Sequence, residues 1–284
     1  MSFSNKRYFS LSDLSRPLQE CSATALLDVR YFLSEILQCP ISELFSEVYL
    51  TDEQYERVQS MIERRLSYEP VAYILGHCSF WGLEFEVNQS VLIPRPDTEC
   101  LIETVLDNHA NEVLKVLDLG TGCGAIALAL AHERRSWSVQ AVDVCDKALS
   151  LAKRNAIVHE VDSSRVSFSC ASWEDESFFK RCGYDVVVAN PPYIDEKSFQ
   201  VCRSTSLFEP KKALYSSENG LRDLRRIILL GKSVLENQGW MYLEHGFDQG
   251  MVVRSMFYDA GYSSVQTVLD YSGHDRVTFA QKKA

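Results

Sequence analysis

The chain contains 284 residues, of which 46% are hydrophobic, 24% charged and 11% aromatic, as in globular proteins that bury a substantial core. Its length favours two domains, and no apolar run approaches the roughly 20 residues that span a bilayer, so we expect no membrane segment. The 29 Lys and Arg residues against 39 Asp and Glu residues give a formal net charge of −10, which disfavours a protein that coats nucleic acid.

The N-terminal segment is rich in serine but contains Asp13 and lacks the apolar stretch of a secretory signal; a transit peptide is the open alternative. No pair of cysteines has the CxxC spacing that would indicate a zinc or redox site. We therefore expect reduced, buried thiols, no metal and a cytoplasmic location. The nine cysteines are Cys21, Cys39, Cys78, Cys100, Cys123, Cys145, Cys170, Cys182 and Cys202.

The first part of the chain has the apolar spacing of helices. One helix is predicted over Ser22–Gln38 and ends before Pro40. Thr51 and Gln54 form a capping box that begins a second helix, which Glu69-Pro70 ends. We expect a small helical domain over residues 1–75.

A different periodicity follows. From Trp81 to Asn88 apolar and polar residues alternate, which predicts a β-hairpin linker over residues 76–95. Pro94-Arg95-Pro96 forms a rigid joint, and Asp97 or Thr98 can cap the next helix. A second domain is expected over residues 96–284.

In this second domain strand-like and helical segments alternate. This pattern predicts an α/β fold with a mostly parallel sheet, helices on both faces, and an antiparallel last strand, because the last two strands have no helix between them. The predicted strands are Val113–Leu119, Val139–Val142, Val166–Ser169, Tyr184–Ala189, Trp240–Glu244, Ser264–Asp270 and Arg276–Ala280. The predicted helices are Leu101–Asn108, Ala125–Glu133, Lys147–His159, Leu221–Glu236 and Gln249–Ala260.

A glycine-rich loop follows the first of these strands. Gly120, Gly122 and Gly124 allow a sharp turn and a close approach of the backbone to a ligand, and Asp143, 23 residues beyond Gly120, ends the next strand. A carboxylate at that position can accept hydrogen bonds from ribose hydroxyls. The loop lacks the G-x-G-x-x-G spacing and any Lys or Arg for phosphate, which favours S-adenosylmethionine over a dinucleotide. A purely structural turn is the alternative.

The predicted strand Tyr184–Ala189 runs into Asn190-Pro191-Pro192-Tyr193. The Asn190 side-chain oxygen and the Pro191 carbonyl can each accept one N–H of a planar NH₂ group, and Tyr193 can pack on its flat face. This arrangement suits methylation of an amide or exocyclic amine, although a rigid turn that ends a strand is the alternative.

With these motifs the sequence resembles the glutamine methyltransferases that modify peptide-chain release factors, over nearly its whole length. The motifs that carry the resemblance are Leu92-Ile93-Pro94-Arg95-Pro96-Asp97-Thr98-Glu99, Leu117-Asp118-Leu119-Gly120-Thr121-Gly122-Cys123-Gly124-Ala125-Ile126-Ala127, Ala189-Asn190-Pro191-Pro192-Tyr193-Ile194, Phe208-Glu209-Pro210 and Leu243-Glu244-His245-Gly246. The resemblance implies a Rossmann-like class I methyltransferase that methylates the side-chain amide nitrogen of the glutamine in the release factors' Gly-Gly-Gln loop, with S-adenosyl-L-homocysteine as the other product.

The resemblance also implies residue roles. The cofactor would be bound by Gly120, Thr121, Gly122, Cys123, Gly124, Asp143 and Asn190, with Trp173 against the adenine. Asn190, Pro191, Pro192 and Tyr193 would form the substrate pocket, with Asn190, Pro191 and Tyr193 catalytic. The helical domain and hairpin would grip the release factor, with no direct contact to nucleic acid.

Several points stay open at this level. Tyr215–Asn219 departs from the family pattern, and Arg95 either pairs with a carboxylate near the active site or bridges the domains. Glu244 and His245 are interpreted as structural, because methylation of a neutral NH₂ requires no general base. The alternatives in function are an adenine amino-methyltransferase acting on DNA or RNA, which the acidic composition disfavours, and a cofactor-binding scaffold without catalysis. A monomer is expected.

Overall fold

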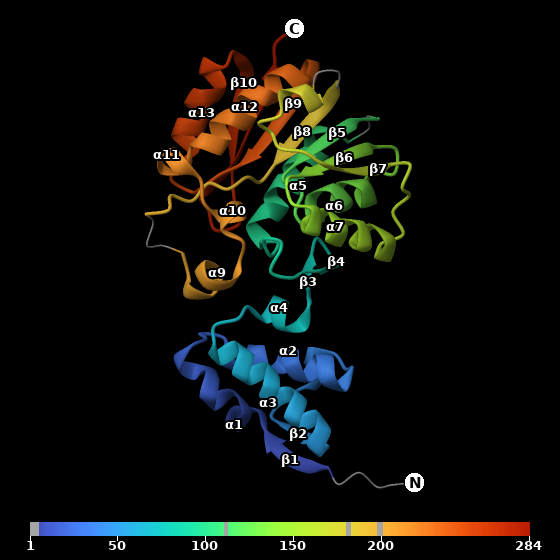
Figure 1. Ribbon diagram of the computed structural model, residues 1–284, viewed down its shortest axis with the longest axis vertical. Coiled ribbons are helices and arrows are strands. Elements are labelled where there is room, and N and C mark those ends of the chain that lie inside the picture. Colours follow the sequence, from blue (N-terminus) through green and yellow to red (C-terminus); the bar gives the residue numbers. More distant parts are fainter. Residues whose placement is uncertain (1–5, 111–112, 180–182, 198–200) are drawn as a thin grey trace. The chain divides into compact units, whose positions relative to one another are not determined.

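The computed structural model in Figure 1 describes residues 6–110, 113–179, 183–197 and 201–284. The chain forms two compact units. The first contains the described residues of Met1–His77 together with Val201–Phe208, and the second contains those of Cys78–Gln200 and Glu209–Ala284. The division into domains at residues 75 and 95 stays a prediction.

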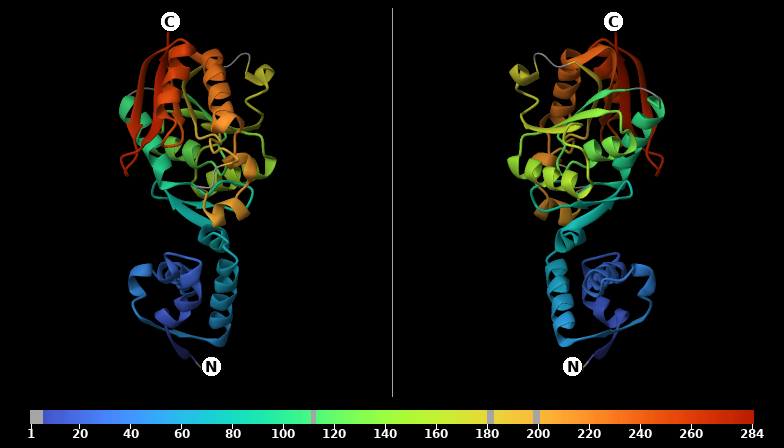
Figure 2. Two further views of the ribbon diagram at one scale, coloured as in Figure 1. Left: turned by 90° about the vertical axis from the view of Figure 1, so that its left-hand side faces the viewer. Right: turned by 90° about the vertical axis from the view of Figure 1, so that its right-hand side faces the viewer.

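The first unit is mainly helical. Its helices and 3₁₀ turns are α1 (Leu11–Ser15), η1 (Arg16–Glu20), α2 (Ala25–Leu37), η2 (Ile41–Glu43), α3 (Asp52–Leu66), α4 (Val71–Leu75) and α9 (Arg203–Phe208). Helices α2 and α3 lie side by side (Figure 2). Apolar side chains from both helices, such as Phe32 of α2 and Val58 of α3, are buried in one hydrophobic core. Burial of this apolar face stabilises the unit.

A short antiparallel ribbon in the first unit was not predicted. Strand β1 (Arg7–Ser10) pairs with β2 (Glu47–Leu50), so this part of the chain is not purely helical. Each strand has only four residues, and β1 buries none of its side chains deeply. The sequence of β1 therefore shows no clear alternation of apolar and polar residues that would predict a strand.

The second unit contains a seven-stranded sheet and a separate hairpin. The strands of the sheet are β5 (Lys115–Leu119), β6 (Ser138–Asp143), β7 (Val166–Cys170), β8 (Tyr184–Ala189), β9 (Leu235–Glu244), β10 (Tyr262–Leu269) and β11 (Asp275–Lys282), in the order β10-β11-β9-β8-β5-β6-β7. Strand β11 is antiparallel to both of its neighbours, and the other pairings are parallel. The predicted mostly parallel sheet with an antiparallel last strand is therefore confirmed.

Helices cover both faces of this sheet. Figure 1 shows α5 (Glu99–Asn108), α6 (Ala125–Glu133) and α7 (Asp146–Val158) on one face, and α12 (Arg222–Val234) and α13 (Gly250–Asp259) on the other. The shorter elements are η3 (Pro96–Thr98), α8 (Glu176–Phe179), α10 (Lys211–Leu214) and α11 (Ser217–Gly220), and the hairpin consists of β3 (His77–Phe80) and β4 (Leu83–Glu86). Every residue from Ala125 to Ala131 is buried, which explains why this stretch of α6 is apolar on all sides.

Two predicted boundaries were wrong. Helix α12 ends at Val234 and β9 begins at Leu235, whereas the prediction extended the helix to Glu236 and began the strand at Trp240. No Gly or Pro separates the two elements until Gly239, so the sequence has no breaker at the real junction. The side chain of Thr98 also makes no capping bond to α5, although Thr98 occupies the N-cap position.

The capping box predicted at the start of α3 is confirmed. Gln54 N–H donates to Thr51 Oγ1 over 3.2 Å, and Thr51 N–H donates to Gln54 Oε1 over 2.9 Å. We expect Thr51→Ala to lower the free energy of unfolding by about 1 kcal/mol, because it leaves one donor at the helix start without its partner. Denaturant unfolding followed by circular dichroism measures this change. Thr51→Ser, which keeps the hydroxyl, should lose much less, and an equal loss would contradict the capping explanation.

Candidate active site

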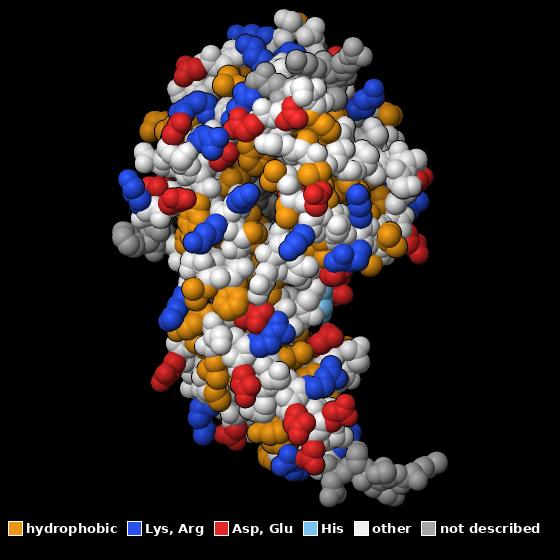
Figure 3. Space-filling model, viewed as in Figure 1, with side chains coloured by type: hydrophobic (Ala, Val, Ile, Leu, Met, Phe, Trp, Pro, Cys, Tyr) orange, Lys and Arg blue, Asp and Glu red, His pale blue; other side chains and the backbone are white. Residues whose placement is uncertain are grey.

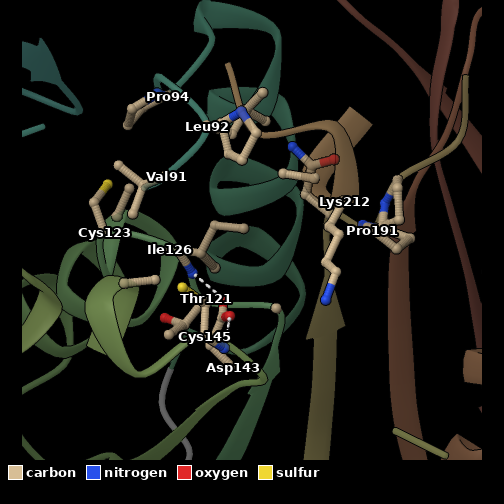
Figure 4. Close-up of a pocket in the computed structure, with 18 of the residues that line it drawn as sticks. Val91, Leu92, Pro94, Thr121, Cys123, Ile126, Asp143, Cys145, Pro191 and Lys212 are labelled. Carbon is tan, nitrogen blue, oxygen red and sulfur yellow. Dashed lines mark hydrogen bonds between the residues drawn. The ribbon is translucent and has the colours of Figure 1, made fainter. Parts of the chain in front are cut away.

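A cavity of about 270 Å³ lies in the second unit where three sheet strands end (Figure 4). Strands β5, β6 and β8 are parallel, so their carboxyl ends meet at one edge of the sheet, where ligands of open α/β folds bind. The cavity is lined by nine of the predicted site residues, namely Gly120, Thr121, Gly122, Cys123, Asp143, Trp173, Asn190, Pro191 and Pro192. Gly124 and Tyr193 do not line it.

The glycine loop is held tightly against the neighbouring strand end. The N–H groups of Gly120 and Thr121 both donate to the Val142 carbonyl, over 2.8 and 3.0 Å. Gly120 has a φ of +79°, and Gly124, at the start of α6, has a φ of +88°, in the region that side chains other than glycine rarely adopt. A Cβ on Gly124 would also approach Leu128 to 3.1 Å, so this glycine is required by both conformation and packing.

Asp143 ends β6 and faces the cavity. Its Oδ2 accepts from Gly122 N–H and its Oδ1 from Cys145 N–H, each over 2.9 Å. Burial raises the pKa of Asp143, and these backbone donors oppose that rise by stabilising the charged form. Each oxygen keeps a further lone pair, so the carboxylate can accept hydrogen bonds from a ligand's hydroxyl groups.

Asn190 follows β8 directly, and its amide nitrogen Nδ2 donates to Thr98 Oγ1 over 3.1 Å. Among the residues that the structure describes, none donates to the amide oxygen Oδ1. The Pro191 ring next to it supplies a carbonyl but no N–H. This part of the cavity therefore presents hydrogen-bond acceptors, which suits a ligand that carries an NH₂ group.

Tyr193 is the last residue of the loop Asn190–Tyr193 and does not line the cavity. Its hydroxyl donates to Glu244 Oε1 over 3.1 Å, and its carbonyl accepts from Gln249 Nε2 over 2.9 Å. Burial raises the pKa of Tyr193 far above its ordinary value, so the hydroxyl stays protonated. Gly220 approaches the Tyr193 carbonyl so closely that a Cβ would lie 2.0 Å from its oxygen. The loop Asn190–Tyr193 is thus fixed from several sides.

Trp173 forms one wall of the cavity beside the glycine loop. A Cβ on Gly120 would lie 3.4 Å from Trp173 Cζ3, which places the indole against the loop backbone. The indole Nε1–H donates to Asp223 Oδ1 over 3.1 Å, and Ser216 Oγ donates to Asp223 Oδ2 over 2.5 Å. Ser216 lies in the stretch that departs from the family pattern, so that stretch helps to hold the wall of the cavity.

Two positioning residues were not predicted from the sequence. Glu209 is buried, accepts from Ile93 N–H over 3.0 Å and pairs with Arg95, which shows that Arg95 meets a carboxylate beside the cavity. Asn155 donates to the Cys123 carbonyl over 2.9 Å and accepts from Glu86 N–H over 2.8 Å. A polar residue on the buried face of α7 was the available signal for Asn155.

Basic side chains reach the cavity from outside the glycine loop. Arg95, Lys211 and Lys212 line it, and Figure 4 shows the Lys212 side chain extending into it. The glycine loop itself contains no Lys or Arg, so the positive charge at the cavity comes from these other segments. The cavity thus combines the acidic Asp143 with a basic wall.

Two family models match the chain. The PrmC N-terminal domain matches residues 11–76, and the methyltransferase small domain matches residues 96–220. The release factor glutamine methyltransferase of Aliivibrio fischeri is 42% identical over 265 residues, which are 92% of this chain and 92% of that protein. That of Salmonella typhimurium is 44% identical over 234 residues, 82% of this chain and 83% of that protein. A solved methyltransferase from Pyrococcus furiosus, 17% identical, shares the fold with a TM-score of 0.54 over 80% of this chain and 98% of that one.

The sheet order, the glycine loop and the acceptor-rich loop after β8 define a Rossmann-like class I methyltransferase that uses S-adenosylmethionine. Within this class, the similarity over nine-tenths of the chain is decisive. The chain belongs to the family of release factor glutamine methyltransferases, which confirms the resemblance seen in the sequence.

In the described part of the chain, no helix has the length and apolar character needed to cross a membrane. The same residues contain no group of three or more His, Cys, Asp or Glu side chains arranged to hold a metal ion. The eight cysteines that the structure describes are all free, while Cys182 lies outside the described residues.

Asp118, two residues before Gly120, is fully buried, and neither of its carboxyl oxygens accepts a hydrogen bond of normal geometry from the described residues. Burial raises its pKa from 3.8 to about 7, although the nearby Thr121 hydroxyl and Ala127 N–H act in the opposite direction. The folded protein therefore keeps a proton that the unfolded chain loses between about pH 4 and pH 7. Its contribution to stability falls as pH rises through that window.

We expect Asp118→Asn to remove this pH dependence. The free energy of unfolding of the variant, minus that of the wild type, should increase by roughly 3 to 4 kcal/mol between pH 4 and pH 7. Denaturant titrations at several pH values measure the difference. Asp162→Asn is the control: hydrogen bonds from Ser164 lower the pKa of Asp162, so its difference should change in the opposite direction. A pH-independent difference for Asp118→Asn would contradict the assignment.

Proposed function

We propose that this protein transfers a methyl group from S-adenosylmethionine to the side-chain amide nitrogen of the glutamine in the Gly-Gly-Gln motif of peptide-chain release factors. The names of the relatives support this activity. The observation that carries it is the position of Asn190: its side chain lines the same cavity as Asp143 and the glycine loop, with its nitrogen engaged by Thr98 and its oxygen available.

The residues around the cavity fit this cofactor. The glycine loop lets its backbone approach a ligand, Asp143 offers two carboxylate oxygens for ribose hydroxyls, and Trp173 offers a flat aromatic surface for adenine. We assign the predicted roles on this basis, with Gly124 acting indirectly by starting α6 beside the loop. When bound, S-adenosylmethionine supplies an electrophilic methyl group on a sulfonium centre.

The chain's own groups act on the glutamine amide. Asn190 Oδ1 and the Pro191 carbonyl each accept one N–H of the substrate NH₂, which fixes the direction of its nitrogen lone pair. An amide nitrogen is a weak nucleophile because its lone pair is delocalised, and acceptors on both N–H groups favour its change toward tetrahedral geometry. Positioning of this kind can contribute roughly 7–11 kcal/mol to lowering a barrier.

Tyr193 has a supporting role in this proposal. Its ring belongs to the substrate loop, but its hydroxyl is bound to Glu244 and does not line the cavity. We therefore assign Tyr193 to the shape of the substrate pocket, where it holds Asn190 and Pro192 in place. This replaces the direct catalytic contact that the sequence suggested with an indirect one.

The first unit is proposed as the part that recognises the release factor. It carries exposed apolar side chains, among them Leu26, Tyr31, Phe45 and Tyr49, which suit contact with a protein partner. The proposal includes class 1 release factors as partners, a cytoplasmic location where translation ends, and a monomeric enzyme.

Methylation of adenine in DNA or RNA is less well supported. A base-flipping enzyme needs a cationic surface that binds phosphates. On helix α12, however, Arg222 and Arg226 pair with Glu174, and Arg225 pairs with Glu218. Figure 3 shows basic and acidic side chains interspersed over the face it displays. The named relatives also favour the glutamine substrate over adenine.

The direct test is mass spectrometry of a release factor incubated with the protein and S-adenosylmethionine. We expect one added CH₂ unit on the intact release factor, and fragmentation should place it on the Gly-Gly-Gln glutamine. A release factor whose glutamine is replaced by alanine is the control and should gain nothing. Methyl groups found on adenine of added nucleic acid instead, or on no substrate at all, would contradict the proposal.

Substitution of Asn190 tests the central role. We expect Asn190→Ala to lower turnover by more than about a hundredfold, because it removes one preorganised acceptor for the substrate N–H. Asn108→Ala is a matched control: Asn108 donates to Tyr242 at the end of α5 and does not line the cavity, so turnover should stay close to that of the wild type. Wild-type turnover in a folded Asn190→Ala variant would disprove the assigned role.

A further inference from the structure

The Asn190 amide must face the cavity with its oxygen for the proposed function to work. An asparagine amide has an oxygen and an NH₂ group of nearly the same size, so packing alone distinguishes them poorly. If the amide were turned round, its NH₂ would face the substrate NH₂, and two donors would meet. The fold therefore needs a hydrogen-bond partner that accepts the Asn190 nitrogen on the side away from the cavity.

Thr98 is placed to be that partner. It is only 4% exposed, its hydroxyl makes no capping bond to α5, and its Oγ1 accepts from Asn190 Nδ2 over 3.1 Å. A threonine hydroxyl, however, can also donate, and a donating hydroxyl would select the Asn190 oxygen instead. The orientation of the amide thus depends on where the single Thr98 hydroxyl proton points.

Glu244 decides the direction of that proton. Strand β9 runs parallel to β8 with Leu243 opposite Ala189, so Glu244, the last residue of β9, lies level with Asn190, the first residue after β8. Glu244 is 1% exposed, and its Oε1 accepts from the Tyr193 hydroxyl over 3.1 Å. Its other oxygen, Oε2, is buried and accepts no hydrogen bond of normal geometry from the described residues, while the nearby Thr98 hydroxyl lowers the pKa of this carboxyl group. An ionised carboxylate can only accept, so a Thr98 hydroxyl whose proton turns toward this unpaired oxygen donates to it and keeps a lone pair for Asn190.

We infer that Thr98 and Glu244 are positioning residues that fix the Asn190 amide with its nitrogen toward Thr98 and its oxygen toward the substrate. This inference rests on the proposed function and adds two residues to it. The relay runs from the carboxylate of Glu244 through the Thr98 hydroxyl to Asn190, and it also anchors Tyr193. Glu244 is thus more than a structural residue, although it takes no proton from the substrate.

The orientation of the Asn190 amide should depend on pH, because the relay begins at a titratable carboxyl group. Burial raises the pKa of Glu244 to about 7, and Thr98, Arg276 and Tyr193 oppose this rise. The other titratable groups that interact with it are Asp97 and Cys100. A protonated Glu244 can donate to Thr98, whose hydroxyl is then free to donate to Asn190. The fraction of correctly oriented amide therefore falls as pH drops below about 7.

The test measures methyl transfer to a release factor for Thr98→Val, Thr98→Ser and Glu244→Gln. We expect Thr98→Val to lower kcat by about ten- to a hundredfold, since the isosteric side chain lacks the acceptor. Thr98→Ser keeps the hydroxyl and should restore kcat to within about threefold of the wild type. The matched control is Thr104→Val in α5, the helix that Thr98 precedes, because the Thr104 hydroxyl donates to the Cys100 carbonyl and lies outside the cavity.

Two further readouts separate positioning from a loss of structure. The dissociation constant of S-adenosylhomocysteine, measured by calorimetry, should change by less than about threefold in all Thr98 variants. In the wild type kcat should rise with pH to a plateau above about pH 7, and this rise should disappear in Glu244→Gln and Thr98→Val.

The inference would be overturned if folded Thr98→Val kept wild-type kcat, or if Thr98→Ser were as impaired as Thr98→Val. If Glu244→Gln does not fold, the Thr98 pair and its pH profiles decide the question. A wild-type protein that leaves the release factor unmethylated would instead overturn the proposed function, and the relay with it.

Discussion

The alignment of parallel strands determines where every important group of the site lies. Leu119 of β5 is opposite both Val142 of β6 and Ala189 of β8, and Ala189 is opposite Leu243 of β9. The residues that follow Leu119, Val142, Ala189 and Leu243 in the chain are Gly120, Asp143, Asn190 and Glu244, respectively. Four strands therefore bring one residue each to the same level at the sheet edge: Asp143 and Glu244 are the last residues of β6 and β9, and Gly120 and Asn190 are the first residues after β5 and β8. A shift of register by one residue would turn each of these side chains to the other face.

Burial makes the hydrogen bonds at this edge selective. Asp118, Tyr193 and Glu244 all have raised pKa values because their charged forms are desolvated. In such surroundings an unmatched donor or acceptor costs more than in water, so each hydrogen-bond direction is strongly preferred. The Asn190 amide gains its orientation from this environment, which is how a residue without charge can direct a weak nucleophile.

Much of the fold was predictable from the sequence, because alternating helices and strands allow few topologies. The strand over Tyr184–Ala189 and the helix over Ala125–Glu133 have the predicted bounds, since apolar residues dominate both segments. The junction at Val234 and Leu235 lacks a breaker, and β1 is too short for a pattern, so these were missed.

The prediction of the site was similarly uneven. Motifs locate residues that precede or follow a strand, and nine of the predicted site residues do line one cavity. Hydrogen-bond partners from segments that are distant in the sequence form no motif that would predict their contact. Thr98 and Asn190 are hydrogen-bonded although they are 92 positions apart in the sequence. Arg95 and Glu209 are hydrogen-bonded although they are 114 positions apart. No local pattern encodes these pairs, and only the folded chain reveals them.

The most direct test of this account is a crystal structure of the protein with S-adenosylhomocysteine and a Gly-Gly-Gln peptide. The account predicts the glutamine NH₂ in the cavity, with one N–H donating to Asn190 Oδ1, the other to the Pro191 carbonyl, and the nitrogen directed at the cofactor sulfur. It also predicts ribose hydroxyls on Asp143. A glutamine bound with its carbonyl oxygen toward Asn190, or outside this cavity, would contradict it.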